Sequence, residues 1–323
     1  MMQRKVIKLI KPFFQKEVLC IKNVSFSLFQ FMRYTYFLIG ILSLLIACTK
    51  KETPDPIPTP TTYTKTTIAY KSINGVDANL LSLDLYYYSQ EPSNKPIVVY
   101  VHGGAWQVGD KANQITNKVN LFNSLGYIFV SINYRLSTSA SIKYPIHNID
   151  VADAVKWVYD NIGNYGGDKN KIALLGHSAG AHLVSLTGTS NQFLPSLGLP
   201  VNTLKGVASI DTEGYDVSIQ GNEGEAVYLN AFGNNSATWQ EASPINHLFT
   251  GRVYPKFFVA KRGSATRIGF ADTFISKLSS VGVDVSQVNG SQYDHEGIND
   301  AIGAPNETAI TEPLKAFFAK CFQ

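Results

Sequence analysis

The sequence predicts an α/β fold, with a mostly parallel sheet, helices on both faces and an antiparallel hairpin near its start. Three observations carry this prediction. Short, continuously apolar segments, typical of strands buried on both faces, recur along the chain. They alternate with segments of helical periodicity, as in proteins with parallel sheets. One apolar segment leads into a Gly-x-Ser-x-Gly turn, and an apolar helix follows that turn.

The hairpin is predicted at residues 66–72 and 80–88, which alternate in polarity and flank Asn74-Gly75. The later strands are short and apolar, and are expected at 97–101, 127–135, 171–177, 204–210, 254–260 and 283–288. Helices are expected between and after them, at 113–125, 144–163, 181–186, 270–278 and 313–322. Residues 212–250 have weak periodicity and many Gly and Asn, which favours a lid or cap.

The formal net charge of the 323-residue chain is +4, but the basic excess is confined to its first 47 residues. These hold seven Lys and Arg and one Glu, which leaves 21 basic and 23 acidic side chains in the rest, a net charge of −2. The body of the chain therefore carries no basic footprint for nucleic acid. Three cysteines are too few for a disulfide framework. No Cys/His cluster with metal-ligand spacing and no phosphate loop occurs in the sequence, so neither a metal nor a cofactor is expected.

Residues 1–47 are predicted to be a leader that ends in a signal peptide. Translation starts at Met1 or at Met32, whose neighbour Arg33 supplies a positive charge before an apolar run at 36–47. A dozen apolar residues are too few to span a bilayer of about 30 Å, which takes about 20, but they are typical of a signal peptide. The run ends in Leu-Ile-Ala-Cys48, which resembles the lipobox of bacterial lipoproteins.

That resemblance implies cleavage before Cys48, lipidation of this cysteine, and export to a bacterial membrane of the cell envelope. The leaflet stays open, and an ordinary signal peptide or an uncleaved anchor is the alternative. Residues 48–65 have proline at every second position from Pro54 to Pro60. Such a segment favours an extended spacer between the anchor and the domain at 66–323.

Ser178 is the candidate nucleophile. It sits in Gly176-His-Ser-Ala-Gly180, between a predicted buried strand and a predicted helix. A turn of this kind lifts the serine hydroxyl above the sheet, where a neighbouring base can take its proton. The free amides of the helix N-terminus point at negative charge that develops there.

A second motif, His102-Gly-Gly-Ala-Trp106, follows another predicted strand. Together the two motifs resemble the α/β-hydrolase superfamily, in particular the hormone-sensitive-lipase-like and feruloyl/acetyl-xylan-esterase-like bacterial carboxylesterases. The resemblance covers residues 66–323. It implies a serine carboxylesterase that works through an acyl-enzyme, and it implies that the amides of Gly104, Ala105 and Ala179 form the oxyanion hole. Ala105 stands where the common motif has a third glycine, a change that keeps the amide.

His295 is the candidate base. The order of the triad on this fold is serine, acid, histidine, and His182, His247 and His295 are the histidines that follow Ser178. His182 falls within the predicted helix, and His247 lies in the predicted cap. His295 follows the last predicted strand, in the loop where the family carries its histidine.

Several residues are candidates for the acid of the triad. In the family it usually lies a few residues beyond the strand predicted at 254–260, but Thr266 stands there in this chain. Asp211 directly follows the strand predicted at 204–210 and is the first candidate. Four alternatives stay open: Glu213, Asp216, Asp272 and a triad without an acid.

The expected substrate is an ester on a small molecule or a polysaccharide, and the sequence does not identify it or the oligomeric state. Two alternatives remain. An arylformamidase-like amidase would use the same groups on an activated amide. A lipid-anchored binding protein on a degenerate hydrolase scaffold would need no intact triad, and Thr266 is the observation that favours it.

Overall fold

The computed structural model describes residues 63–88 and 93–323, so the predicted leader, Cys48 and most of the predicted spacer lie outside the described residues. Eight strands form one sheet in the order β1-β2-β4-β3-β5-β6-β7-β8. Strands β1, β2 and β4 pair antiparallel, whereas β4, β3 and β5 to β8 pair parallel. This mostly parallel sheet, with an antiparallel pair at its start, confirms the predicted fold class. The strands are β1 (Thr64–Ala69), β2 (Ser82–Tyr87), β3 (Lys95–Val101), β4 (Ile128–Ile132), β5 (Gly167–His177), β6 (Leu204–Ile210), β7 (Lys256–Lys261) and β8 (Val285–Asn289).

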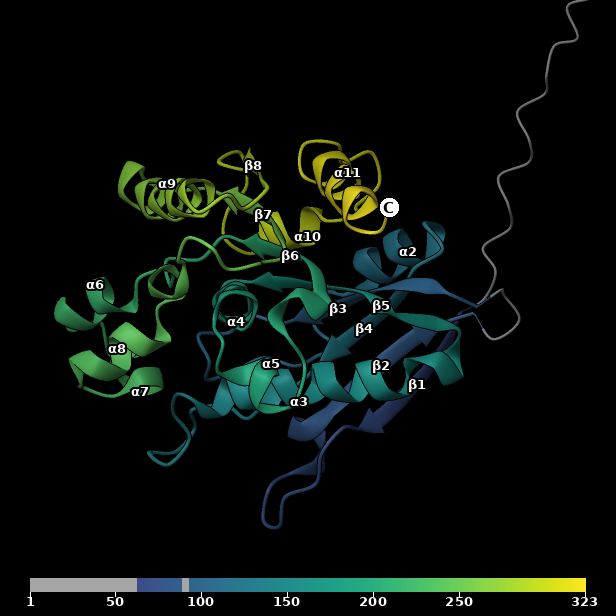
Figure 1. Cartoon of the computed structure of the whole chain (residues 1–323), viewed down its shortest axis with the longest axis horizontal. Coiled ribbons are helices and arrows are strands. Elements are labelled where there is room, and N and C mark those ends of the chain that lie inside the picture. The colour runs from purple at the N-terminus through teal and green to yellow at the C-terminus, as the bar shows by residue number, and fades with distance from the viewer. Residues whose placement is uncertain (1–62, 89–92) are drawn as a thin grey trace, which may run out of the picture. The chain divides into compact units, whose positions relative to one another are not determined.

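Helices cover both faces of the sheet, which is why its central strands are apolar throughout (Figure 1). Along β3, Val99 and Val101 belong to the core under α3 (Ile146–Asn161) and α4 (Ala179–Thr189). Val98 and Tyr100 belong to the core under α2 (Thr116–Ser124) and α11 (Thr311–Cys321). Side chains alternate between the faces of a strand, so burial on both sides requires a continuous apolar run.

The helix after β7 is longer than the sequence pattern predicts. It was expected at 270–278, but α9 runs over Ala265–Ser280. The Ser264 hydroxyl accepts a hydrogen bond from the amide of Arg267 and caps the new first turn. The early start places Arg267 beside the carboxyl end of β6, where it matters for the site below.

The predicted cap region, 212–250, is built from short helices that pack on one another (Figure 1). They are α6 (Val217–Asn222), α7 (Ala226–Phe232), α8 (Ser236–Ala242) and the 3-10 helix η4 (Pro244–His247). Their role as a lid stays a prediction. The other short helices are η1 (Ala78–Leu81), η2 (Ile162–Tyr165), α5 (Phe193–Ser196), η3 (Val201–Thr203) and α10 (Gly297–Ala301).

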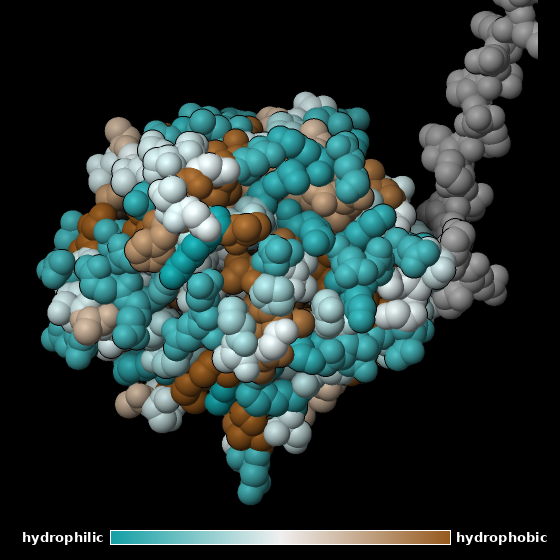
Figure 2. All heavy atoms as spheres, viewed as in Figure 1, coloured by the Kyte–Doolittle hydropathy of each residue, from teal (hydrophilic) through white to brown (hydrophobic). Residues whose placement is uncertain are grey.

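The face of the molecule in Figure 2 is largely hydrophilic, with apolar residues in small groups. Five large apolar side chains of the described residues are exposed: Val108, Ile149, Val227, Phe249 and Val253.

In the part of the chain that the structure describes, no helix has the length and hydropathy needed to cross a bilayer.

Parallel pairing brings the carboxyl ends of β3, β5 and β6 to one edge of the sheet. Val101 pairs with Gly176, and His177 pairs with Ile210. The residues that follow these ends therefore meet above the same edge, which is where ligands bind in sheets of this kind.

Candidate active site

Ser178 occupies a strained turn between β5 and α4. Its backbone has φ 55° and ψ −119°, and its amide donates a hydrogen bond of 3.0 Å to the carbonyl of Ile210. A positive φ costs a residue with a side chain about 1–3 kcal/mol. The flanking glycines permit the turn, because a Cβ on Gly176 would overlap the backbone of Gly180, and one on Gly180 would overlap the carbonyl of Val101.

The structure brings Ser178, His295 and Asp211 together in one hydrogen-bonded chain. Nε2 of His295 lies 2.8 Å from Oγ of Ser178, and Nδ1 of His295 lies 2.6 Å from Oδ2 of Asp211. A carboxylate only accepts hydrogen bonds, so Nδ1 carries the proton and Nε2 is left to accept one from the serine hydroxyl. This arrangement can activate an alcohol as a nucleophile.

The other carboxylates considered from the sequence have other partners. Glu213 forms an ion pair of 2.8 Å with Arg267. Asp216 accepts from the amide of Ser218 and caps α6. Asp272 forms an ion pair with Lys261.

Asp211 is buried and is held by two arginines as well as by His295. Only 1% of its side chain is exposed. Nη1 of Arg262 donates to Oδ2 at 2.8 Å, and Nε of Arg267 donates to Oδ1 at 2.7 Å. Burial alone would raise the pKa of Asp211, but the hydrogen bonds from His295 and the two arginines outweigh it and lower the pKa to about 2. Asp211 is therefore ionised at neutral pH.

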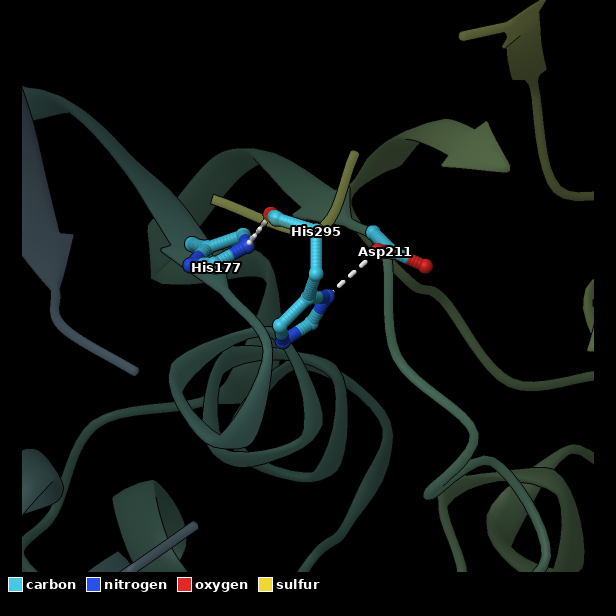
Figure 3. A group of neighbouring side chains, drawn as sticks. All are labelled: His177, Asp211 and His295. Carbon is cyan, nitrogen blue, oxygen red and sulfur yellow. Dashed lines mark hydrogen bonds and ion pairs between the residues drawn. The ribbon is translucent and has the colours of Figure 1, made fainter. Parts of the chain in front are cut away.

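His177 completes the group in Figure 3, where His295 lies between His177 and Asp211. Its Nε2 lies 2.8 Å from the carbonyl oxygen of His295, and thus donates to it. Burial, together with the nearby His295, lowers the pKa of His177 to about 3, so this ring stays neutral. No pattern in the sequence points to His177, because only the fold brings the end of β5 against the loop that carries His295.

The same three residues, His177, Asp211 and His295, offer ligand atoms within 4.8 Å of one another. Both ring nitrogens of His295 and both carboxylate oxygens of Asp211 already take part in hydrogen bonds, however, and Asp211 is paired with Arg262 and Arg267. A metal cation at this point would face both guanidinium groups. The cluster therefore fits a proton-transfer network better than a metal site.

The predicted oxyanion residues lie in two tight turns beside Ser178. Gly104 has φ 105° and Ala105 has φ 54°. Two amides of this turn, from Gln107 and Val108, donate to the carbonyl of Gly104. In the described residues the amides of Gly104 and Ala105 have no acceptor, and the amide of Ala179 is the first of α4 and lacks one within the helix.

A pocket of about 140 Å³ opens beside the Ser178 hydroxyl. One wall is aromatic, from Trp106 and Tyr228, and another is the ion pair between Glu213 and Arg267. Trp106, the last residue of the motif at 102–106, thus lines the pocket. Tyr228 and Arg267 were missed, because no local pattern distinguishes them. The remaining lining residues are Ala105, Ser178, Ala179, Thr212, Val227 and His295.

Known proteins share both the sequence pattern and the fold. The esterase LipQ of Mycobacterium tuberculosis is 43% identical over 95 residues, which is 29% of this chain and 22% of LipQ. The probable carboxylic ester hydrolase LipM of the same organism is 29% identical over 242 residues, which is 69% of this chain and 55% of LipM. The chain thus spans about half or less of the length of these curated relatives.

Among solved structures, a truncated carbohydrate esterase from gut microbiota has the same fold, with a TM-score of 0.65 and 20% identity. The match covers 82% of this chain and 99% of that one. A family model described as BD-FAE matches residues 83–261, more than half of the chain. The chain therefore belongs to the BD-FAE family and has the α/β-hydrolase fold.

Proposed function

We propose that this protein is a serine carboxylesterase. The observation that carries the proposal is the hydrogen-bonded chain from Ser178 through His295 to Asp211, beside amides without acceptors. The names of relatives such as LipQ and LipM, an esterase and a probable carboxylic ester hydrolase, support the same reaction class.

In the proposed reaction, Nε2 of His295 takes the proton of Ser178 as Oγ attacks the ester carbonyl carbon. The amides of Gly104, Ala105 and Ala179 stabilise the resulting oxyanion, because they donate to charge that is absent from the ground state. His295 then gives the proton to the departing alcohol, which leaves an acyl-serine. Water, deprotonated by the same histidine, attacks this intermediate and releases the carboxylic acid.

The pocket favours a short acyl group. Its volume is about 140 Å³. An acetyl or propionyl group fits this space. We propose short-chain esters of small molecules or of polysaccharides as substrates, and the carbohydrate esterase among the structural neighbours supports the second class.

The two alternative functions, amidase and binding protein, differ in the support they have. A formyl group also fits the pocket, so an arylformamidase-like activity remains an outcome of the assay. The proposal of a non-catalytic binding protein rested on Thr266. The contact between Asp211 and His295 removes that support.

The test is to measure hydrolysis of p-nitrophenyl acetate and of N-formylkynurenine by the wild type and by Ser178→Ala and His295→Gln. We expect ester hydrolysis in the wild type, loss of activity in both variants, and labelling of Ser178 by a fluorophosphonate. Faster turnover of N-formylkynurenine would favour the amidase. Unchanged ester hydrolysis in Ser178→Ala would rule out the proposed mechanism.

We also propose that the domain is exported and held at a bacterial membrane through a lipid on Cys48. The support is the lipobox-like segment at 45–48 and the proline-rich spacer after it. Expression of the full chain in a bacterium fed with an alkyne-palmitate should label the wild type and leave Cys48→Ser unlabelled. Equal labelling of both would contradict the anchor.

A further inference from the structure

The segment after β7 carries two arginines near the position where the resemblance leads one to expect an acid. Arg262 directly follows β7, and Arg267 lies in the first turn of α9. Both turn to Asp211, which follows the neighbouring strand β6. The segment after β7 thus supplies two cations to Asp211, and the candidate acid follows β6 and not β7.

The two arginines bind different parts of the site. Arg262 donates through Nη1 to Oδ2 of Asp211, the oxygen that also accepts from His295, and through Nε to the carbonyl of Tyr293 at 3.1 Å. Tyr293 is two residues before His295, so Arg262 bonds both to Asp211 and to the loop that carries His295.

Arg267 orients the carboxylate from its other side. Its Nε donates to Oδ1 of Asp211, its Nη2 lies 3.3 Å from the Asp211 carbonyl, and its Nη1 pairs with Glu213. Because Arg267 and Glu213 also line the pocket, this arginine contacts both Asp211 and the space in which a substrate would bind.

A buried carboxylate needs this support. If both arginines were replaced by neutral residues, the burial of Asp211 would favour its protonated form. A protonated acid would donate to Nδ1 of His295 and leave the proton on Nε2, which is the wrong tautomer for a base. The titratable or charged groups around Asp211 are His295, Arg262 and Arg267, which bond to its carboxylate. His177 and Tyr215 are within electrostatic reach of it, and Glu213 lies beyond Arg267.

We propose that Arg262 and Arg267 are positioning residues that keep Asp211 ionised and directed at His295. The proposal rests on the proposed esterase function. It explains how a triad works in this chain although Thr266 occupies the usual position of the acid. Neither arginine needs to take part in the chemical step.

The first test compares Arg262→Gln and Arg267→Gln with the wild type in the pH dependence of kcat/KM for p-nitrophenyl acetate. For both variants we expect kcat to fall about tenfold or more, and the acid limb of the profile to move up by about one pH unit or more. Arg267→Gln should also raise KM, since Arg267 lines the pocket, whereas Arg262→Gln should leave KM unchanged. Arg267→Lys keeps the charge and should restore the acid limb.

Arg252→Gln is the matched control, because Arg252 stacks on the exposed ring of Phe249, outside the site. It should keep the wild-type profile. A loss of kcat in the two site variants without any shift of the acid limb would overturn the proposal, as would an unchanged kcat. A wild type without esterase activity would instead contradict the proposed function.

The second test does not need activity. Infrared spectra of Arg262→Gln/Arg267→Gln at about pH 5 should show the carbonyl stretch of a protonated carboxyl group that disappears when Asp211→Asn is added. The wild type should lack this difference. If Asp211 stays ionised in the double variant, the arginines do not hold its charge and the proposal fails. Thermal denaturation, together with Arg267→Lys, identifies variants that merely unfold.

Discussion

The carboxylate of Asp211 lies 2.6 Å from Nδ1 of His295, although the two residues are 84 positions apart in the chain. The contact exists because β6 ends directly before Asp211 and the loop after β8 (Val285–Asn289) folds back over the same sheet edge. The contact identifies Asp211 as the carboxylate that bonds to His295. The sequence alone left five possibilities open, which were four carboxylates and a triad without an acid.

Replacing Asp211 by Asn should lower kcat by about a thousandfold or more, because an amide can hold the wrong tautomer of the histidine. The measurement is steady-state hydrolysis of p-nitrophenyl acetate. Asp272→Asn is the control, since Asp272 pairs with Lys261, away from His295. Full activity in Asp211→Asn, or a comparable loss in Asp272→Asn, would show that Asp211 is not the acid.

Shortening Tyr228 to Ala should enlarge the pocket and shift the preference to longer acyl chains. The wild type should cleave acetyl and propionyl esters best, and Tyr228→Ala should raise kcat/KM for hexanoyl esters relative to acetyl esters. Val253→Ala, at an exposed position, should leave the preference unchanged. An identical chain-length profile in Tyr228→Ala would mean that this pocket does not hold the acyl group.

Adding a methyl group at Gly180 should destabilise the elbow. The new Cβ would overlap the carbonyl oxygens of Val101 and His102, and such overpacking costs about 1–3 kcal/mol or more. Gly269→Ala is the matched control, because its Cβ would meet open space within α9, where Ala is favoured over Gly by about 0.5–1 kcal/mol. Urea unfolding should show opposite signs for the two variants, and equal stability would contradict the close packing at the elbow.

Stability should fall as the pH drops below about 6.5. Burial lowers the pKa of His147 and His177 to about 3 and that of His182 to about 4. The unfolded chain therefore binds protons below about pH 6.5 that the native state does not, and each histidine removes up to about 1.4 kcal/mol of unfolding free energy per pH unit. Asp211, whose pKa is lowered, adds a loss only between about pH 4 and 2.

The check is the urea midpoint at about pH 7, 6 and 5. His147→Gln keeps a hydrogen-bonding group for Ser137 and should reduce the slope against pH. A midpoint that does not depend on pH, or a slope that His147→Gln leaves unchanged, would contradict the neutral burial of these histidines.

Sequence reasoning captured the parts of the fold that local patterns encode. The apolar strands, the elbow at Ser178 and the loop of His295 each follow from a short segment and its neighbours. The sequence pattern predicts a start of α9 that lies too late in the chain, because the N-cap, Ser264, is a single polar residue outside the periodic part of the helix.

The parts that could not be predicted depend on distances between separate loops. Whether Asp211 or Glu213 reaches His295 is decided by how β6 and β7 end at the sheet edge, and no spacing in the sequence encodes this. Arg262 and Arg267 look like ordinary surface residues until the fold places Asp211 between them. The same holds for Tyr228, which α7 brings to the pocket.

The most direct test of the central claim is to trap the acyl-enzyme. The wild type, mixed with p-nitrophenyl acetate and quenched in acid within the first turnovers, should gain the mass of one acetyl group, located by peptide mapping on Ser178. Ser178→Ala should gain none. Ester hydrolysis by the wild type without an adduct on Ser178, or an adduct that persists in Ser178→Ala, would contradict the account.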